Sequence, residues 1–236
     1  MIKKTSSKVV GLILSFLVLT VGFVVFMPFL FMFAQSMRLP SDAYRLPPDW
    51  FPTTLDWTNY KTLFTSDLPM LNMLGNSALV TFSIIILRLI VAVLAAYAIA
   101  KIRYRGSNTV MVGFLASMML PIQATIIPLY IIMSNLGLVN TRMSLIIIGI
   151  FDSFCIFMLK QSMATIPDSI VESAKIDGAG HMRICWQIVV PMIKSSLATM
   201  VILIFNGTWN DYFLPYIFIS SWDKMTLPLG INALKG

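Results

Sequence analysis

Long apolar runs alternate with short polar segments along this chain. Five of the runs approach or exceed the about 20 residues that a helix needs to cross a hydrocarbon core about 30 Å thick. They cover approximately residues 9–34, 77–100, 110–133, 144–163 and 193–219. A helix satisfies its backbone hydrogen bonds internally, as a lipid environment requires. The pattern therefore predicts an all-α fold, a polytopic transmembrane helical bundle of five spans, with residues 1–236 forming a single membrane domain.

Basic residues are unevenly distributed among the polar segments. Ten of the 17 Lys and Arg residues lie before the first run, between residues 101 and 105, or between residues 160 and 194. Because Lys and Arg accumulate on the cytoplasmic side of a membrane, we expect the N-terminus and these two loops in the cytoplasm. Residues 35–76, residues 140–142 and the tail after Ser220 are then expected outside. The first run is longer than the hydrophobic region of a signal peptide, and no A-x-A cleavage site follows it. We therefore interpret it as an uncleaved membrane anchor.

Composition and missing motifs exclude several function classes. The chain is 58% hydrophobic and only 11% charged, so its net charge of +7 reflects loop orientation, and nucleic-acid binding is not expected. The sequence has no G-x-x-x-x-G-K-S/T loop for nucleotide phosphates and no H-E-x-x-H metal helix. His181 is its one histidine, and Cys155 and Cys185 form no C-x-x-C motif. We therefore expect no catalytic residue, no metal site and no cofactor bound by this chain, and we do not expect an enzyme.

One part of the long outer loop is predicted to be helical. In "LDWTNYKTLF", residues 55–64, Asp56 can cap a short helix on which Trp57, Tyr60 and Phe64 share a face. Aromatic side chains are enriched where membrane meets water. We interpret this helix as a membrane anchor rather than as a substrate contact.

Two charged residues interrupt the second and fourth runs. Arg88 lies near the middle of its run, where an unpaired Arg costs about 2.5 to 3.5 kcal/mol, and Asp152 lies at a similar depth. Four-residue steps from Arg88 reach Ala92 and Ala96, small residues that let helices pack closely, so Arg88 should face the bundle. We hypothesise a buried Arg88–Asp152 pair; the alternative is that each finds water or a backbone carbonyl separately. Both residues are candidates for a translocation path.

The third and fifth runs also contain unusual residues. Pro121 and Pro128 lie seven residues apart in the third run, and this spacing predicts a bent helix with both prolines on one side. The outer half of the fifth run carries a polar flank, for which hydrogen bonding between helices and the lining of a solute path remain open. The members of this flank, also candidates for the translocation path, are Asn206, Trp209, Asn210 and Asp211.

Residues 171–191 form a charged, glycine-broken stretch that is too polar to cross a membrane. Ser169 and Glu172 have the spacing of a capping box, which predicts a helix over residues 170–176. Gly178 suits the left-handed backbone conformation that ends helices. We therefore expect a short, rigid helix at the cytoplasmic face.

A second helix is predicted over residues 181–190, ending before Pro191. The first helix carries an apolar patch formed by Ile170, Val171 and Ala174. An apolar patch on a projecting helix can occupy a groove in a partner protein. It can equally pack under the chain's own bundle, and the sequence leaves both possibilities open.

The order of these motifs resembles one family of membrane proteins. The charged stretch resembles the signature cytoplasmic loop of ABC importer permeases, whose pattern runs E-A-A, then D-G-A, then I-x-x-P, and the similarity is to the carbohydrate-type branch. The loop residues that carry the resemblance are Glu172, Ala174, Asp177, Gly178, Ala179, Ile188 and Pro191. Further similar segments, in chain order, are "TLDWTNYKTLF", the pair Asn76-Ser77, "AAYAIAKIRYRG", "MMLPIQATIIPLY", "WNDYFLP" and "TLPLGINALKG". The resemblance covers essentially the whole chain.

The resemblance implies a permease subunit of an ATP-binding-cassette importer that moves a sugar or related carbohydrate across the cytoplasmic membrane of a prokaryote. The implied partners are a second permease subunit in a heterodimer, two ATPase subunits that bind ATP and Mg²⁺, an extracytoplasmic sugar-binding protein and the lipid bilayer. Residues 164–192 would form the coupling loop, seated in a groove of the ATPase. The alternative is an ion-coupled secondary transporter with Arg88 and Asp152 as coupling groups, although we find no inverted repeat.

Three features depart from the family pattern. Ser173 stands where the family usually has Ala, a small residue that still fits a groove. Cys185 stands where Phe is common, so we expect looser packing of the second loop helix. Family members continue into a sixth helix, whereas this sequence ends at Gly236 after five runs, so we expect a truncated chain.

Overall fold

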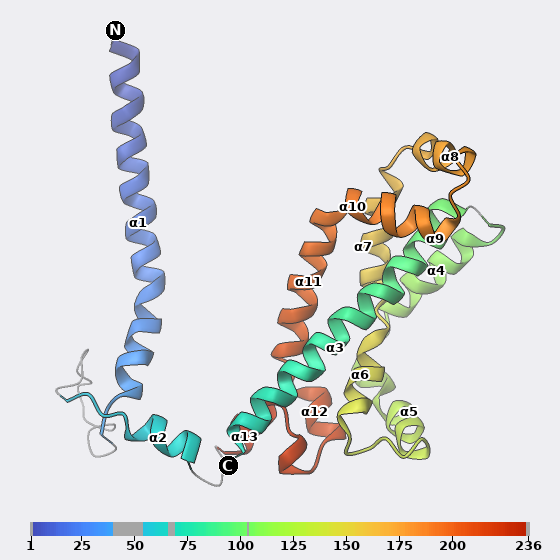
Figure 1. The fold of residues 1–236 in the computed structure, drawn as a ribbon. Coiled ribbons are helices and arrows are strands. Elements are labelled where there is room, and N and C mark those ends of the chain that lie inside the picture. Colours follow the sequence, from blue (N-terminus) through green and yellow to red (C-terminus); the bar gives the residue numbers. More distant parts are fainter. Residues whose placement is uncertain (1, 40–53, 66–68, 103, 235–236) are drawn as a thin grey trace. The chain divides into compact units, whose positions relative to one another are not determined.

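The computed structural model describes residues 2–39, 54–65, 69–102 and 104–234, and for residues 2–9 the backbone alone. Every regular element in these ranges is a helix (Figure 1), which confirms the predicted all-α fold. The chain forms two compact units, residues 1–68 and residues 69–236, which are described in turn.

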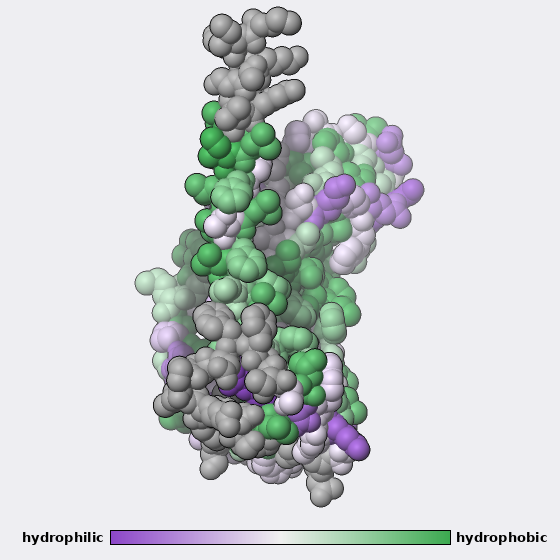
Figure 2. All heavy atoms as spheres, turned by 90° about the vertical axis from the view of Figure 1, so that its left-hand side faces the viewer, coloured by the Kyte–Doolittle hydropathy of each residue, from purple (hydrophilic) through white to green (hydrophobic). Residues whose placement is uncertain are grey.

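The first unit is built on α1 (Ile2–Ser36), a helix of 35 residues. Its segment Val10–Ser36 is long and apolar enough to cross a membrane, and every side chain from Val10 to Leu30 is exposed. Figure 2 shows α1 as a column of hydrophobic surface below its grey terminal turns. A helix that is apolar all round suits a lipid environment. The first predicted span, residues 9–34, lies within this helix.

A short helix, α2 (Thr58–Thr65), follows in the same unit. The side-chain amide of Asn59 donates a hydrogen bond of 3.1 Å to the backbone oxygen of Ser36, a carbonyl at the open end of α1. The Asp56 carboxylate accepts hydrogen bonds from the backbone N–H and the hydroxyl of Thr58, and these bonds lower the pKa of Asp56 below its usual value. The predicted cap at Asp56 is confirmed.

The second unit is a bundle around α3 (Met70–Tyr97), which continues through a π-helical turn, η1 (Ala98–Ile102). The remaining elements, in chain order, are α4 (Ser107–Met118), α5 (Ile122–Asn135), α6 (Arg142–Ile150), α7 (Ser153–Ala164), α8 (Asp168–Ile176), α9 (His181–Ile184), η2 (Cys185–Val189), α10 (Val190–Met192), α11 (Lys194–Trp209), α12 (Phe213–Phe218), η3 (Trp222–Lys224) and α13 (Leu227–Ala233). α3 crosses the unit diagonally and packs against α6, α7 and α11 (Figure 1). Ala92 and Ala96 are buried in these contacts, so the predicted stripe of small residues faces the bundle.

The third predicted span, residues 110–133, is broken rather than merely bent. α4 and α5 meet at an angle of 100°, and Pro121, with an extended backbone, directly precedes α5. Pro128 lies inside α5 without ending it. The bend is therefore confirmed at Pro121, where it is strong enough to end the helix, and a bend at Pro128 stays a prediction.

The fourth and fifth predicted spans are also interrupted. In residues 144–163, α6 ends at Ile150 and α7 begins at Ser153 after two residues with extended backbone. In residues 193–219, α11 ends at Trp209, well short of the predicted end. In the described part of the chain, three segments are long and apolar enough to cross a membrane: Val10–Ser36, Met70–Ile102 and Arg142–Ala164, in which α6 and α7 together count as one span. The number rises to five if each of the two bent pairs, α4 with α5 and His181–Met192 with α11, is also one span. The number of five spans stays a prediction.

The segment before α13 is tied to the N-terminal half of α3. The Asn76 side chain donates hydrogen bonds of 2.9 Å to the backbone oxygens of Asp223 and Met225. The Ser77 hydroxyl accepts a 2.8 Å hydrogen bond from the backbone N–H of Leu227. The Asn76-Ser77 pair therefore holds residues 223–227 beside the start of α3.

We expect Gly149→Ala to destabilise the bundle where α6 meets α3. A Cβ at Gly149 would lie 2.5 Å from Cδ1 of Ile84, so a packed side chain must move, and overpacking of this kind costs about 1–3 kcal/mol. Thermal unfolding of the purified protein in detergent measures the effect. Adding Ile84→Val should recover part of the loss. Gly113→Ala, where the new Cβ has no neighbour within 4 Å, serves as the matched control, and equal effects of the two alanines would contradict the prediction.

Candidate functional site

The charged stretch projects from one end of the bundle. α8 lies beyond the ends of α4 and α7 in Figure 1, and Figure 2 shows hydrophilic side chains gathered at this end of the unit. α8 begins at Asp168, directly after Pro167, and no side chain caps it. The predicted capping box of Ser169 and Glu172 is therefore wrong. The helix starts earlier than predicted because Pro167, with a backbone ψ of 135°, is the N-cap residue, and the helical conformation begins at the next residue.

The end of α8 is formed as predicted. Gly178 has a backbone φ of +78°, the left-handed conformation that glycine adopts without strain. Its N–H donates to the oxygen of Lys175 at 3.0 Å, and the N–H of Ala179 donates to the oxygen of Ala174 at 2.9 Å. This pair of bonds is a Schellman motif, which satisfies the last carbonyls of a helix. α8 is thus a closed, rigid unit.

The second helix of the stretch is longer than predicted. α9, η2 and α10 run without a break from His181 to Met192, so Pro191 lies inside the helical segment instead of following it. The π-helical turn η2 widens the helix directly before Pro191, where the proline ring would otherwise crowd the preceding turn. The break comes at Ile193, where α10 and α11 meet at an angle of 82°.

The apolar patch of α8 packs against its own bundle. Val171 and Ala174 are only 3% and 8% exposed and belong to the hydrophobic core. Of the two possibilities that the sequence left open, the structure shows packing under the bundle. The opposite face of α8 is open, and Ile176 is 86% exposed. The other exposed residues of α8 and of the turn that follows it are Ser169, Glu172, Ser173, Lys175, Asp177 and Gly178.

The remaining loop residues that the sequence singled out have different environments. Ala179 and Ile188 are half-buried and pack against the core, and Cys185 is fully buried. Pro191 is exposed. The predicted set is therefore divided between an outward surface and residues that hold the stretch in place.

Arg88 and Asp152 form the hypothesised ion pair. Nη1 of Arg88 lies 2.9 Å from Oδ2 of Asp152, and Nε of Arg88 donates a 2.6 Å hydrogen bond to the backbone oxygen of Gly149. The other carboxylate oxygen of Asp152 accepts hydrogen bonds from the N–H groups of Phe154 and Cys155, at 2.8 and 3.1 Å. Asp152 is therefore also the N-cap of α7. Together the two residues stabilise the break between α6 and α7.

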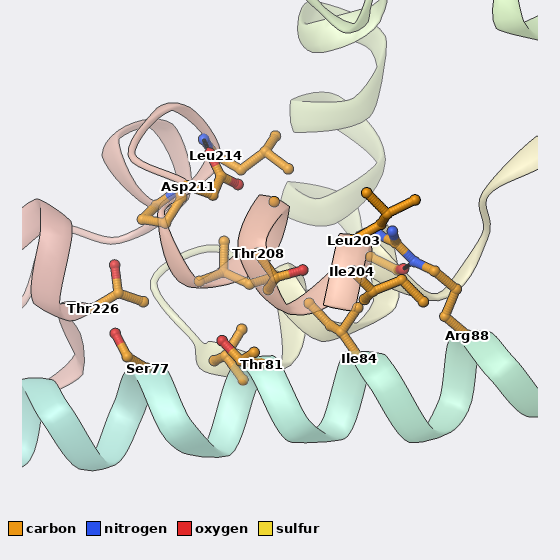
Figure 3. A pocket seen from close by; sticks show the side chains of 15 residues that line it. Ser77, Thr81, Ile84, Arg88, Leu203, Ile204, Thr208, Asp211, Leu214 and Thr226 are labelled. Atoms are coloured by element: carbon orange, nitrogen blue, oxygen red, sulfur yellow. Dashed lines mark hydrogen bonds between the residues drawn. The ribbon is translucent and has the colours of Figure 1, made fainter. Parts of the chain in front are cut away.

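A cavity of about 150 Å³, lined by apolar side chains with several polar ones among them, lies between α3 and the break that follows α11. Figure 3 shows Ser77 and Arg88 on the α3 side of the cavity and Thr208 and Asp211 across from them. The buried hydroxyl of Thr226 has no hydrogen-bond partner among the described residues. Buried polar groups require such partners, so the cavity is suited to water or to the hydroxyl groups of a solute.

Two further recesses are lined by other residues that the sequence marked as candidates for the translocation path. One, of about 620 Å³, is lined by Arg88, Asp152 and Phe151 at the break between α6 and α7. Arg88 borders both this recess and the cavity beside Thr226. The other, of about 290 Å³, is lined by Trp209 and Asn210 beside α13.

The polar flank of the fifth predicted span is only partly helical. The Asn210 amide donates hydrogen bonds of 2.9 Å to the backbone oxygen and to the side-chain oxygen of Asn206, so the predicted stacking of these two residues is confirmed. The prediction that the helix continues through Asp211 is wrong, since α11 ends at Trp209. Its carboxylate accepts hydrogen bonds from the N–H groups of Phe213 and Leu214, at 2.9 and 3.4 Å, at the start of α12. The chain leaves the helix because this acid caps the next one.

Comparisons with known proteins identify similar sequences and structures. Residues 88–233 match the family model described as "Binding-protein-dependent transport system inner membrane component". The chain is 32% identical, over 88% of its length, to the inner membrane ABC transporter permease protein YcjP of Escherichia coli, and it covers 75% of that protein. It is 31% identical, over 78% of its length, to the arabinooligosaccharides transport system permease protein AraQ of Halalkalibacterium halodurans, and it covers 66% of that protein.

Two more comparisons are consistent with these. The chain is 33% identical, over 69% of its length, to the sn-glycerol-3-phosphate transport system permease protein UgpE of Yersinia pestis, of which it covers 58%. A crystal structure of a bacterial ABC transporter involved in the import of the acidic polysaccharide alginate superimposes with a TM-score of 0.81 at 25% identity, over 98% of this chain and 80% of that one. The fold described above is therefore shared with a solved importer.

Proposed function

Because the chain belongs to the family of binding-protein-dependent transport system inner membrane components, we propose that it is a transmembrane permease subunit of an ABC importer for a sugar or related carbohydrate. Membership of this family supports the ABC importer over the ion-coupled secondary transporter. The chain is thus a transport subunit of the cytoplasmic membrane rather than an enzyme. ATP and Mg²⁺ are bound and used by separate ATPase subunits.

The proposed cargo rests on what similar proteins carry. The names of two of the similar permeases refer to arabinooligosaccharides and sn-glycerol-3-phosphate. Both solutes carry hydroxyl groups, and hydroxyl, amide and charged side chains are among those that line the recesses of this chain. In this proposal Arg88, Asp152 and Asp211 contribute to the path of the solute. A second permease completes the path, and an extracytoplasmic sugar-binding protein delivers the solute to it.

The observation that carries the proposed coupling is the rigid, capped helix α8 with one face left open. Glu172, Ser173 and Asp177 lie on its exposed side, where an ATPase subunit can bind. Behind that surface Ala174, Ala179 and Ile188 pack in or against the core, while Gly178 forms the turn that ends α8 and Pro191 lies further on, in α10. This end of the bundle, like the N-terminus, faces the cytoplasm in the proposal, since basic residues are concentrated in both.

Transport assays on a purified complex test this function. The chain is co-expressed with a second permease, ATPase and binding protein from the same organism, and the complex is reconstituted into proteoliposomes. We expect uptake of a labelled oligosaccharide with ATP and none with a non-hydrolysable ATP analogue. Uptake that follows an imposed ion gradient without ATP would instead identify a secondary transporter.

A further inference from the structure

One buried lysine joins the end of α3 to the start of α8. The Lys101 side chain is 2% exposed, although the sequence places it in a polar loop. Its Nζ donates hydrogen bonds of 2.6 Å to the backbone oxygen of Ile166 and of 2.9 Å to Oδ1 of Asp168. Ile166 lies just before α8, and Asp168 is in its first turn. A buried ammonium group with two partners is a strong link, because leaving it unpaired is costly.

A second contact joins the same end of α3 to the other half of the stretch. The hydroxyl of Tyr97 lies 3.2 Å from Nδ1 of His181, the first residue of α9, and the two rings meet edge to face. Tyr97 and Lys101 are four residues apart, across the π-helical turn η1. One short segment of α3 and η1 therefore holds both sides of the loop that contains α8.

The position of these contacts suits the transmission of motion. α3 is the helix against which α6, α7 and α11 pack, so a displacement at its end reaches most of the bundle. Val171 and Ala174 give α8 an apolar contact with the bundle, but apolar contacts are non-directional and can slide. An ion pair and a hydrogen bond with fixed geometry do not slide in this way.

We propose that Lys101, assisted by Tyr97, is the positioning residue that makes α8 and the end of α3 move as one body. This role rests on the proposed function, in which α8 receives the motion of an ATPase. In that cycle Lys101 converts a displacement of α8 into a displacement of α3. Loss of the link leaves the ATPase bound but disconnected from the bundle.

Hydrogen exchange of the full chain in detergent tests the link itself. In Lys101→Met we expect the backbone amides of residues 168–179 to exchange at least about tenfold faster, because the buried Lys101 ammonium group no longer holds Ile166 and the partly exposed Asp168. Lys101→Arg keeps the charge and should restore slow exchange. Lys194→Met, which changes an exposed lysine at the start of α11, is the matched control. Unchanged exchange of residues 168–179 in Lys101→Met overturns the proposal, whatever the protein transports.

Uptake and ATP hydrolysis by the reconstituted complex test the consequence. For Lys101→Met we expect basal ATP hydrolysis within about twofold of the wild type, and a loss of sugar uptake of about tenfold or more. Asp168→Asn keeps the hydrogen bond of Lys101 to the backbone oxygen of Ile166, so we expect a smaller loss of sugar uptake than in Lys101→Met. It replaces Lys101→Met as the deciding variant if that variant does not assemble.

The outcomes separate the inference from the function on which it rests. Faster exchange together with normal uptake overturns the coupling role of Lys101 but leaves the importer assignment intact. A wild-type complex that takes up no sugar with ATP contradicts the proposed function, and the exchange measurement still decides whether Lys101 positions α8.

Discussion

Replacing Gly178 by valine should abolish ATP-driven sugar uptake while leaving the protein in the membrane. The backbone φ of +78° at this position costs a residue with a side chain about 1–2 kcal/mol, and a β-branched residue more. The strain weakens the two Schellman hydrogen bonds that end α8. The last turn of the helix then frays, and the backbone between α8 and α9 no longer has one fixed conformation. Uptake in proteoliposomes and the amount of membrane-inserted protein are the two measurements.

Gly180 provides the matched control for this prediction. It lies two residues further along and has an ordinary φ of −71°, and a Cβ added to it would have no neighbour within 4 Å. Gly180→Ala should therefore transport nearly as well as the wild type. If Gly178→Val retained normal uptake, the shape of α8 would not matter for transport, and the proposed coupling role would have to be abandoned.

Breaking the Arg88–Asp152 pair should have the largest effect on stability. Arg88→Met leaves the Asp152 carboxylate without its partner inside the bundle, and loss of one member of a buried pair costs about 3–5 kcal/mol. The pair is not completely buried, with side chains 17% and 26% exposed, so we expect a value near the lower end of that range. Thermal unfolding in detergent measures the loss, and uptake is expected to fall with it.

The double variant distinguishes pairing from separate roles. Asp152→Asn retains an oxygen that can cap α7 but removes the charge. Arg88→Met combined with Asp152→Asn should therefore be more stable than Arg88→Met alone, because no uncompensated charge remains. Purely additive losses would show that the two residues act independently.

Features that depend on local chemistry could be predicted from the sequence. Gly178 was identified as a helix end because few other residues accept its backbone conformation. Arg88 and Asp152 were paired because an isolated charge in an apolar helix is costly and the two lie at similar depth. The general pattern of long apolar helices followed from length alone.

Features in which one residue has two functions could not be predicted. Asp152 appeared only as a charge within an apolar run, and nothing local indicated that it also caps α7 and breaks the fourth span. Asp211 was assigned to a helical flank, although the spacing of Asp211 to Leu214 was a signal for a new helix start that the apolar run concealed. The capping box predicted at Ser169 is not formed, because α8 already begins at Asp168, directly after Pro167.

Sequence patterns also could not predict the burial of a residue by residues that are distant in the sequence. Lys101 was counted among the basic residues that set the orientation, and such residues are normally solvated. Its burial depends on Ile166 and Asp168, which lie 65 and 67 residues away and come close only when α7 packs on α3. The same applies to the apolar patch of α8, for which both a partner and the chain's own bundle were compatible with the sequence.

The most direct test of the central claim, that α8 receives the motion of an ATPase, is a cross-linking measurement on the transporting complex. Ile176→Cys places a thiol on the most exposed apolar position of α8, while Cys155 and Cys185 are buried. A short thiol-to-lysine cross-linker should join position 176 to the ATPase subunit, with a yield that changes between ATP-bound and nucleotide-free complex. Met119→Cys, at an exposed position between α4 and α5, should give no such product. A complex that transports sugar but never cross-links from position 176 to the ATPase would contradict the account.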